Sequence, residues 1–121
     1  MKYVLMYVSR PDLDAEADRE VAQALYKRVY EWFGENAGVM TDSGAELLGI
    51  ETATTIKHGD DGPVVVDGPF NEAKEVIGGF SVIDVADMDA AIAVTKSWPL
   101  LGIPGGSVEI RPMVEDYSQF E

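Results

Sequence analysis

The segment 2-KYVLMYV-8 is the part of the chain whose pattern decides the fold. It is rich in β-branched and aromatic residues, and no breaker follows it until Pro11. A short apolar run of this kind is typical of a buried strand. Because both faces of the run are apolar, we expect a strand that is covered, fully or nearly so, on both sides.

A long amphipathic helix is expected after this strand. Asp14 and Glu16 carry the negative charge that a helix N-terminus favours, and Pro11 precedes them in the turn. From Ala15 to about Phe33, apolar side chains recur at helical spacing. They are Val21, Leu25, Val29, Trp32 and Phe33. Glycine and asparagine in residues 34–38 favour the end of the helix there.

A β-hairpin is expected in the middle of the chain. Thr52–Lys57 is rich in β-branched residues, and a turn cluster of glycine, aspartate and proline separates it from Val64–Val66, the returning strand. The preceding residues, 39–50, give no clear pattern, since Gly44 and Gly49 bracket a short apolar piece. The hairpin leaves room for an extra short strand.

The second half of the chain again has the order strand, helix, strand. Gly79–Val85 is the fourth expected strand, a helix follows from Ala86–Asp89 to Pro99, and Ser107–Met113 is the last strand. The order β-α-β-β-β-α-β predicts one α+β domain over residues 1–121, a ferredoxin-like sandwich with an antiparallel sheet and helices on one face. Because the other face must be covered, we expect a homodimer packed sheet against sheet.

The composition excludes several classes of function. A formal net charge of −13 argues against direct contact with nucleic acid or an anionic membrane surface. The chain has no cysteine, so we expect no disulfide, thiolate metal site or thiol nucleophile. A zinc site on carboxylates and one histidine is uncommon, and no glycine-rich cofactor loop follows a strand, so no metal or cofactor is expected. The single histidine, His58, lies in a turn, where exposure is favoured over a role as a general base. No apolar run could span a membrane and no signal peptide is evident, so a cytoplasmic protein is expected.

One stretch resembles the signature of a known family. Val66–Phe70 (VDGPF), Glu72–Glu75 (EAKE) and Gly78–Phe80 (GGF) resemble the DGPF subfamily of the YCII-related proteins. The resemblance extends in order over nearly the whole chain. Its flanking segments are Lys2–Met6, Thr54–Ile56, Asp87–Ala91, Trp98–Pro99 and Val108–Pro112. It implies a dimeric α/β-barrel made of two ferredoxin-like subunits.

Two departures limit what the resemblance implies about chemistry. The YCII-related enzymes use a histidine of the first helix with an aspartate after it, but here that helix carries Tyr26 and Tyr30 and no histidine. The His–Asp mechanism therefore does not carry over. Ala73 stands where DGPF relatives usually have threonine, which removes one hydroxyl near the motif.

The candidate acid–base residues are Asp67, Lys74 and Glu75, in and after the DGPF motif. Asp67 either caps the turn by accepting backbone N–H bonds, the commoner role of such an aspartate, or faces a ligand as an acid or base. Lys74 and Glu75 either act near an anionic substrate or form an exposed ion pair worth about 0–1 kcal/mol. Gly78 and Gly79 permit a bulge or a close approach to the backbone.

The candidate ligand-binding residues are Arg111, Tyr7 and Tyr30. Arg111 lies in an expected core strand, where an arginine needs a partner: Asp67, Glu75 or a ligand carboxylate. The hydroxyl of Tyr7 or of Tyr30 is expected in a pocket between the sheet and a helix.

Two functions are compatible with these residues. The first is binding of a small molecule in a pocket between sheet and helices, including cofactor-independent acid–base catalysis of the isomerase or lyase type on a small aromatic or lactone-like acid. The alternative, which the resemblance suggests, is a non-catalytic accessory or regulatory protein linked to an extracytoplasmic-function sigma factor. The sequence contains no nucleophile–base pair, so it does not identify a reaction.

Overall fold

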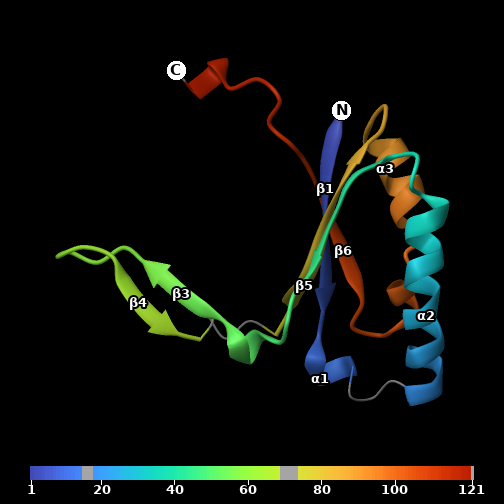
Figure 1. Cartoon of the computed structure of the whole chain (residues 1–121), viewed down its shortest axis with the longest axis horizontal. Helices are drawn as coiled ribbons and strands as arrows, with labels where there is room; N and C mark the ends of the chain where they lie inside the picture. Colours follow the sequence, from blue (N-terminus) through green and yellow to red (C-terminus); the bar gives the residue numbers. More distant parts are fainter. Residues whose placement is uncertain (15–17, 69–73, 121) are drawn as a thin grey trace.

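The computed structural model describes residues 1–14, 18–68 and 74–120, and Figure 1 shows their arrangement. The strands are β1 (Lys2–Ser9), β2 (Met40–Glu46), β3 (Thr54–Lys57), β4 (Val64–Asp67), β5 (Val76–Asp84) and β6 (Ser107–Pro112). The α-helices are α1 (Pro11–Asp14), α2 (Arg19–Glu35) and α3 (Met88–Thr95). Three short 3-10 helices complete the fold: η1 (Ile50–Thr52), η2 (Pro99–Gly102) and η3 (Ser118–Phe120).

The main sheet has the strand order of a ferredoxin-like fold. Its order is β2-β5-β1-β6, and every neighbouring pair is antiparallel. Helices α2 and α3 lie on the same face of this sheet (Figure 1). The predicted α+β sandwich, with an antiparallel sheet and helices on one face, is therefore confirmed.

The central strand β1 is covered on one face only. Tyr3 and Leu5 point toward the helices and are buried, whereas Val4 and Met6 point the other way and are half-buried. The expectation of a strand covered on both sides is therefore wrong for a single chain. The opposite face, called the open face below, carries no described helix (Figure 1).

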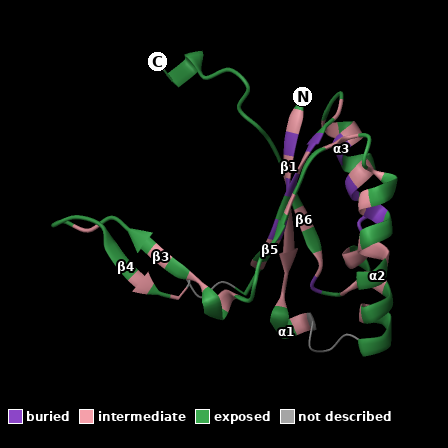
Figure 2. Cartoon of the chain, viewed as in Figure 1, coloured by how far each residue is buried: buried purple, intermediate pink, exposed green. Residues whose placement is uncertain are grey.

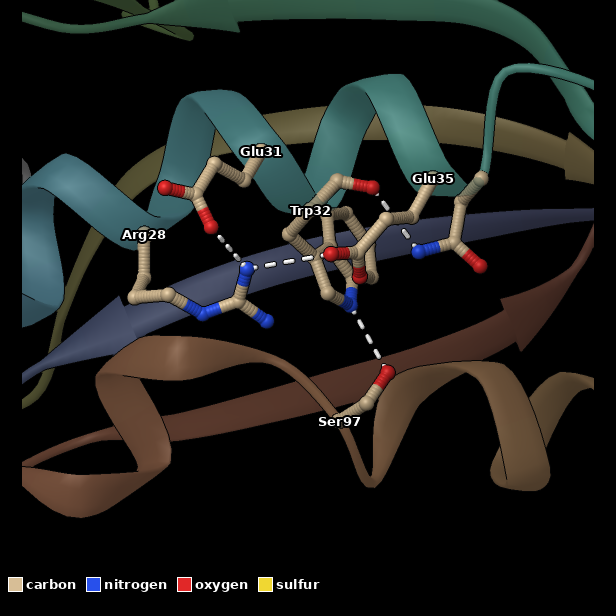
Figure 3. Close-up of polar contacts among 6 residues, drawn as sticks. Arg28, Glu31, Trp32, Glu35 and Ser97 are labelled. Atoms are coloured by element: carbon tan, nitrogen blue, oxygen red, sulfur yellow. Dashed lines mark hydrogen bonds and ion pairs between the residues drawn. The ribbon is translucent and has the colours of Figure 1, made fainter.

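An aromatic core joins α2 to the end of α3. Trp32 of α2 is fully buried, and its indole Nε1 donates a hydrogen bond of 2.8 Å to Ser97 Oγ (Figure 3). Arg28 of α2 is exposed and forms ion pairs with Glu31 and Glu35 (Figure 3). The core thus sits between the sheet and the helices.

Helix α2 begins later than its sequence pattern suggests. Asp18 is the N-cap, because one carboxylate oxygen accepts hydrogen bonds from the backbone N–H groups of Glu20 and Val21. The predicted start, Ala15, lies outside the described residues, as does Glu16. The second helix, by contrast, is capped as predicted by an aspartate, Asp87, which accepts from the N–H of Ala90.

Strand β2 is the element that the sequence did not indicate. Its residues, MTDSGAE, are mostly polar and exposed because β2 is an edge strand. Gly44 has a φ of 76°, and a Cβ atom at this position would lie 1.7 Å from the carbonyl oxygen of Phe80. Only glycine therefore lets β2 approach β5 closely enough to pair with it.

The predicted hairpin forms, but it stands apart from the main sheet. Strands β3 and β4 pair in register from Thr54 opposite Asp67 to Lys57 opposite Val64, and they pair with no other described strand. The hairpin projects from the body on the side away from the helices, and most of it is exposed (Figures 1 and 2). The second strand of the ferredoxin-like sheet is therefore β2, not the predicted segment that begins at Thr52.

The two glycines after the DGPF motif serve both of their predicted roles. The register of β1 against β5 shifts between Tyr7 and Val8, which leaves Gly78 as an extra residue in a bulge. Gly79 is buried, and a Cβ atom there would lie 2.7 Å from the carbonyl oxygen of Ala45. Within the motif itself, residues 69–73 lie outside the described residues.

Candidate functional site

Tyr7 lies between the sheet and α2 and begins a short chain of hydrogen bonds. Its hydroxyl donates to Ser81 Oγ over 2.8 Å, and Ser81 Oγ donates to the carbonyl oxygen of Ser43 over 2.7 Å. Burial raises the pKa of Tyr7, and the bond to Ser81 opposes this rise only in part. Like any tyrosine, Tyr7 is a protonated phenol at neutral pH, and its one hydroxyl hydrogen is directed to Ser81. Ser81 is fully buried, and no sequence pattern singled it out.

Aromatic rings hold Tyr7 in place. Its ring stacks on that of Trp98 with centroids 4.1 Å apart and planes 21° apart. Trp32 and Phe33 of α2 meet the Tyr7 ring edge-on, each at 6.5 Å. These aromatic neighbours reduce the contact of the half-buried phenol with water, which explains why burial is the largest influence on the pKa of Tyr7. The structure places this hydroxyl at the sheet–helix interface, and a ligand-binding role for it stays a prediction.

A groove of about 200 Å³ lies on the helix side of the sheet, between α3, η2 and β6. Its lining residues are Ile92, Thr95, Lys96, Leu101, Val108 and Ile110. The hydroxyl group of Thr95 does not donate a hydrogen bond into the groove, because it donates to the carbonyl oxygen of Ala91. Lys96 is the one charged side chain among the lining residues, so the groove combines apolar walls with a single ammonium group.

Lys96 was not among the residues that sequence reasoning proposed. It is the C-cap of α3, and the preceding Thr95 is buried on the inner face of the helix. The signal that could have indicated this position is a lysine at the end of a predicted helix, directly after the inward-facing Thr95. The hydroxyl of Tyr7 points the other way, toward Ser81 on β5 and Ser43 on β2, so it does not enter the groove.

The predicted acid–base residues lie at the base of the hairpin, outside the groove. Asp67 ends β4, and Lys74 and Glu75 come directly before β5; all three are exposed. The turn that Asp67 would cap runs into residues 69–73, beyond the described part of the chain, so capping stays a prediction. Glu75 lies close enough to Arg10 for the charge of its carboxylate to raise the pKa of the Arg10 guanidinium.

Arg10 is the residue in this region that the sequence interpretation overlooked. Its guanidinium pairs with Asp12, Nη2 to Oδ2, over 2.7 Å. The hydrogen bond to Asp12 raises the pKa of Arg10, and the charge of Glu75 raises it further. The same bond lowers the pKa of Asp12. This exposed cluster lies at the paired ends of β1 and β5, where Ser9 is opposite Val76.

The predicted ligand-binding residues Arg111 and Tyr30 do not lie near Tyr7. Arg111 is opposite Val4 in the register of β6 against β1, which places it on the open face, and it is exposed. No ion pair joins it to Asp67 or Glu75 among the described residues, so the expected buried pair is not found. Tyr30 is 84% exposed on α2, so the expectation that its hydroxyl lies in a pocket between sheet and helix is wrong for the single chain.

His58 lies at the turn of the hairpin and is exposed, as the sequence indicated. The residues of this turn line an open, shallow pocket of about 510 Å³. No group of three or more metal-binding side chains is found in residues 1–14, 18–68 and 74–120. No helix in the described parts of the chain is long and apolar enough to cross a membrane.

The profile of the YCII-related domain matches residues 1–115. The chain belongs to the YCII-related family. This YCII-related protein is 36% identical, over 69 residues, to an uncharacterised protein of Rhizobium meliloti strain 1021. That match covers 57% of the chain and 56% of the relative, so it spans little more than half of either protein.

A solved structure has the same fold as this YCII-related protein. It is 5-chloro-2-hydroxyhydroquinone dehydrochlorinase (TftG) from Burkholderia phenoliruptrix AC1100, in complex with 2,5-dihydroxybenzoquinone. The two structures superpose with a TM-score of 0.58 over 96% of each chain, at 14% sequence identity. The likeness is one of fold. The regulatory alternative receives no support from these comparisons.

Proposed function

We propose that this YCII-related protein binds a small, largely apolar molecule with one negative charge, and that Lys96 holds the charged group. The observation that carries the proposal is the groove between α3, η2 and β6, in which Lys96 is the sole charged lining residue. Ligand sites are typically concave and apolar, with few polar groups that fix orientation. At about 200 Å³ the groove suits a molecule of about one ring, such as an aromatic carboxylate.

The binding test is a titration with benzoate as the first probe and benzamide as its uncharged counterpart. Amide NMR shifts of Thr95, Leu101 and Ile110 should move with benzoate and much less with benzamide. Lys96→Met should weaken benzoate binding roughly tenfold, as expected when a charge-assisted contact is lost. Lys27→Met, an exposed lysine of α2, is the matched control and should bind as the wild type does. Equal binding by Lys96→Met would contradict the proposal.

The active form we propose is a homodimer packed sheet against sheet. In each chain the open face carries apolar side chains at its centre, including Met6 opposite Phe80 and Val4 opposite Val82. Phe80 is 38% exposed and its neighbour Ile77 is 50% exposed. A second copy would cover these side chains, and an isologous interface would do so for both copies at once.

We extend the proposal to cofactor-independent acid–base turnover of the isomerase or lyase type. The observation that favours it is the relay from Tyr7 through Ser81 to the carbonyl oxygen of Ser43, in which the Tyr7 hydroxyl is oriented at the sheet–helix interface, so Tyr7 would act only by exchanging its bond to Ser81 for one to a substrate outside the groove. The structural relative is named a dehydrochlorinase, and removal of HCl is an elimination, which is a reaction of the lyase type. Turnover of chlorinated hydroquinones should fall sharply in Tyr7→Phe and stay unchanged in Tyr30→Phe. Absence of turnover in the wild type would remove this extension and leave the binding proposal intact.

The exposed residues Asp67, Lys74, Glu75 and Arg111 remain proposed as acid–base and anion-binding groups. Arg111 belongs to the open face, and the hairpin that ends in Asp67 projects on the same side of the sheet (Figure 1). A second copy would approach on this side, so these charges would act at the dimer rather than in the groove. Asp67→Asn and Arg111→Met should change turnover without changing benzoate binding in the groove. Loss of groove binding in either variant would contradict this separation.

A further inference from the structure

The hairpin β3–β4 presents an apolar face that its own chain does not cover. Ile56 is 68% exposed, Val65 is 65% exposed, and the two residues are direct cross-strand partners. Their side chains therefore point to the same face of the hairpin. Its described polar contacts are internal: Thr55 Oγ1 donates to the carbonyl oxygen of Gly68, and the N–H of Gly68 donates to Ala53.

A hairpin in this situation needs a partner surface. Two-stranded hairpins without further packing are marginally stable in water, so an arm of this kind is expected to gain its order from a surface that covers it. Figure 2 shows that the arm is mainly exposed and extends away from the body. Its own sheet and helices do not supply that surface, since β3 and β4 form a sheet of their own.

The direction of the arm indicates where the covering surface lies. The arm projects on the side of the main sheet opposite α2 and α3, and the C-terminal segment extends on that side as well (Figure 1). This is the side on which the open face lies. Anything that covers the open face therefore comes within reach of the arm.

The size of the open face shows that the sheet alone is a small interface. Four strands of six to nine residues make a face of roughly 25 Å by 20 Å, or roughly 1,000 Å² for two copies. Stable interfaces typically bury about 1,600 Å², so the sheet face alone is smaller than a typical stable interface. The arm, from Thr54 to its turn, extends about 20 Å at about 3.3 Å per residue, which is enough to cross a facing sheet.

We propose that the β3–β4 hairpin is a dimerisation arm, whose Ile56–Val65 face packs against a second copy of this chain. The arm adds apolar area to an interface that the sheet face alone would leave small. In a dimer with two-fold symmetry, the arm of each copy would pack against the other copy. The inference rests on the proposed sheet-to-sheet homodimer, because the facing copy is what brings the covering surface to the arm.

The test compares full-length variants by sedimentation equilibrium. Ile56→Asp combined with Val65→Asp should weaken dimerisation roughly tenfold or more, since two apolar side chains lose their burial. Both residues lie outside the core, so far-UV circular dichroism and the thermal midpoint of the monomer should stay unchanged. Val21→Asp is the matched control, because Val21 is 53% exposed on α2, and its dimerisation constant should equal that of the wild type.

Hydrogen exchange supplies a second measurement that does not depend on substitutions. Protection of the amides of the arm should rise with protein concentration, in parallel with the dimer fraction. If Phe80→Asp abolishes the dimer while the arm variant dimerises like the wild type, the dimer stands and the arm proposal is overturned. A wild type that is monomeric at all concentrations overturns both, and arm amides that are protected in the monomer overturn the arm proposal. Benzoate binding in the groove is scored separately in each variant.

Discussion

The indole Nε1 of Trp32 donates a hydrogen bond to Ser97 Oγ, and Ser97 Oγ in turn donates to the carbonyl oxygen of Val94. The first bond joins α2 to the turn that follows α3, across 65 residues of sequence. Trp32 is fully buried, so its N–H has no access to water. This one contact therefore satisfies a buried donor and fixes how the two helices lie on the sheet.

Ser97→Ala should lower the free energy of unfolding by about 1–3 kcal/mol, the usual penalty for an unsatisfied buried donor. Equilibrium denaturation in urea measures the change. Ser107→Ala at the exposed start of β6 is the control and should stay within about 0.5 kcal/mol of the wild type. A neutral Ser97→Ala variant would mean that the indole N–H finds another acceptor.

Tyr7 should make the stability of the protein depend on pH in the alkaline range. Burial raises the pKa of Tyr7 in the folded state above that in the unfolded chain. Below about pH 10 Tyr7 is protonated in both states, so its contribution to the free energy of unfolding is fully present. Above about pH 10 the unfolded chain loses this proton first, and stability falls until the folded pKa is passed. Unfolding free energies of the wild type should therefore drop more steeply above pH 10 than those of Tyr7→Phe.

Tyr30→Phe is the control for the alkaline experiment, because the Tyr30 side chain is exposed. Its stability should follow the wild-type dependence on pH. Absorbance at the tyrosinate wavelength offers a direct check, since the late ionisation of Tyr7 in the wild type should disappear from the titration of Tyr7→Phe. Identical late ionisation in both proteins would refute the assignment to Tyr7.

Gly44→Ala should destabilise the protein by more than about 2 kcal/mol, because the residue has a positive φ and the new Cβ would collide with the carbonyl oxygen of Phe80. Gly34→Ala is a matched substitution near the end of α2, where a Cβ meets nothing within 4 Å. It should stabilise by about 0.5–1 kcal/mol through helix propensity. Thermal unfolding of both variants decides the comparison, and a tolerated Gly44→Ala would argue against the β2–β5 pairing.

The proposed sheet interface should respond to charge in two ways. Phe80→Asp, or Ile77→Asp as a second variant with more exposure, should shift the protein toward monomer in light scattering, while Val21→Asp should not. Two chains of net charge −13 repel each other, so the wild-type dimer should tighten as salt is added. Insensitivity of the oligomeric state to the open-face variants would exclude this face as the interface.

Much of the fold could be predicted because the pattern and the environment agree. Strand β1 and helix α2 have strong apolar periodicity, and the Asp87 cap of α3 depends only on neighbouring backbone groups. Strand β2 could not be predicted, because an exposed edge strand needs no apolar residues and its pairing depends on Gly44 approaching Phe80, a residue distant in sequence.

The candidate site was less accessible to sequence reasoning. Tyr7 was proposed from its place in an apolar strand, and the structure shows it at the sheet–helix interface. Lys96 gave only a weak local signal, since its importance depends on the strand β6 that faces it across the groove. Asp67, Lys74 and Glu75 belong to a recognisable motif, but a motif does not indicate which face of the protein its side chains occupy.

The sequence by itself determined the family, the ferredoxin-like order of elements and the expectation that one sheet face needs a partner. These depend on periodicity, capping and a local motif, all of which are read along the chain. Only the tertiary structure decided that Tyr7 meets Ser81, that Lys96 lines a groove, and that Arg111 lies on the opposite face from Tyr7. Such relationships depend on strand order and register, which place residues far apart in sequence on the same face or on opposite faces of one sheet.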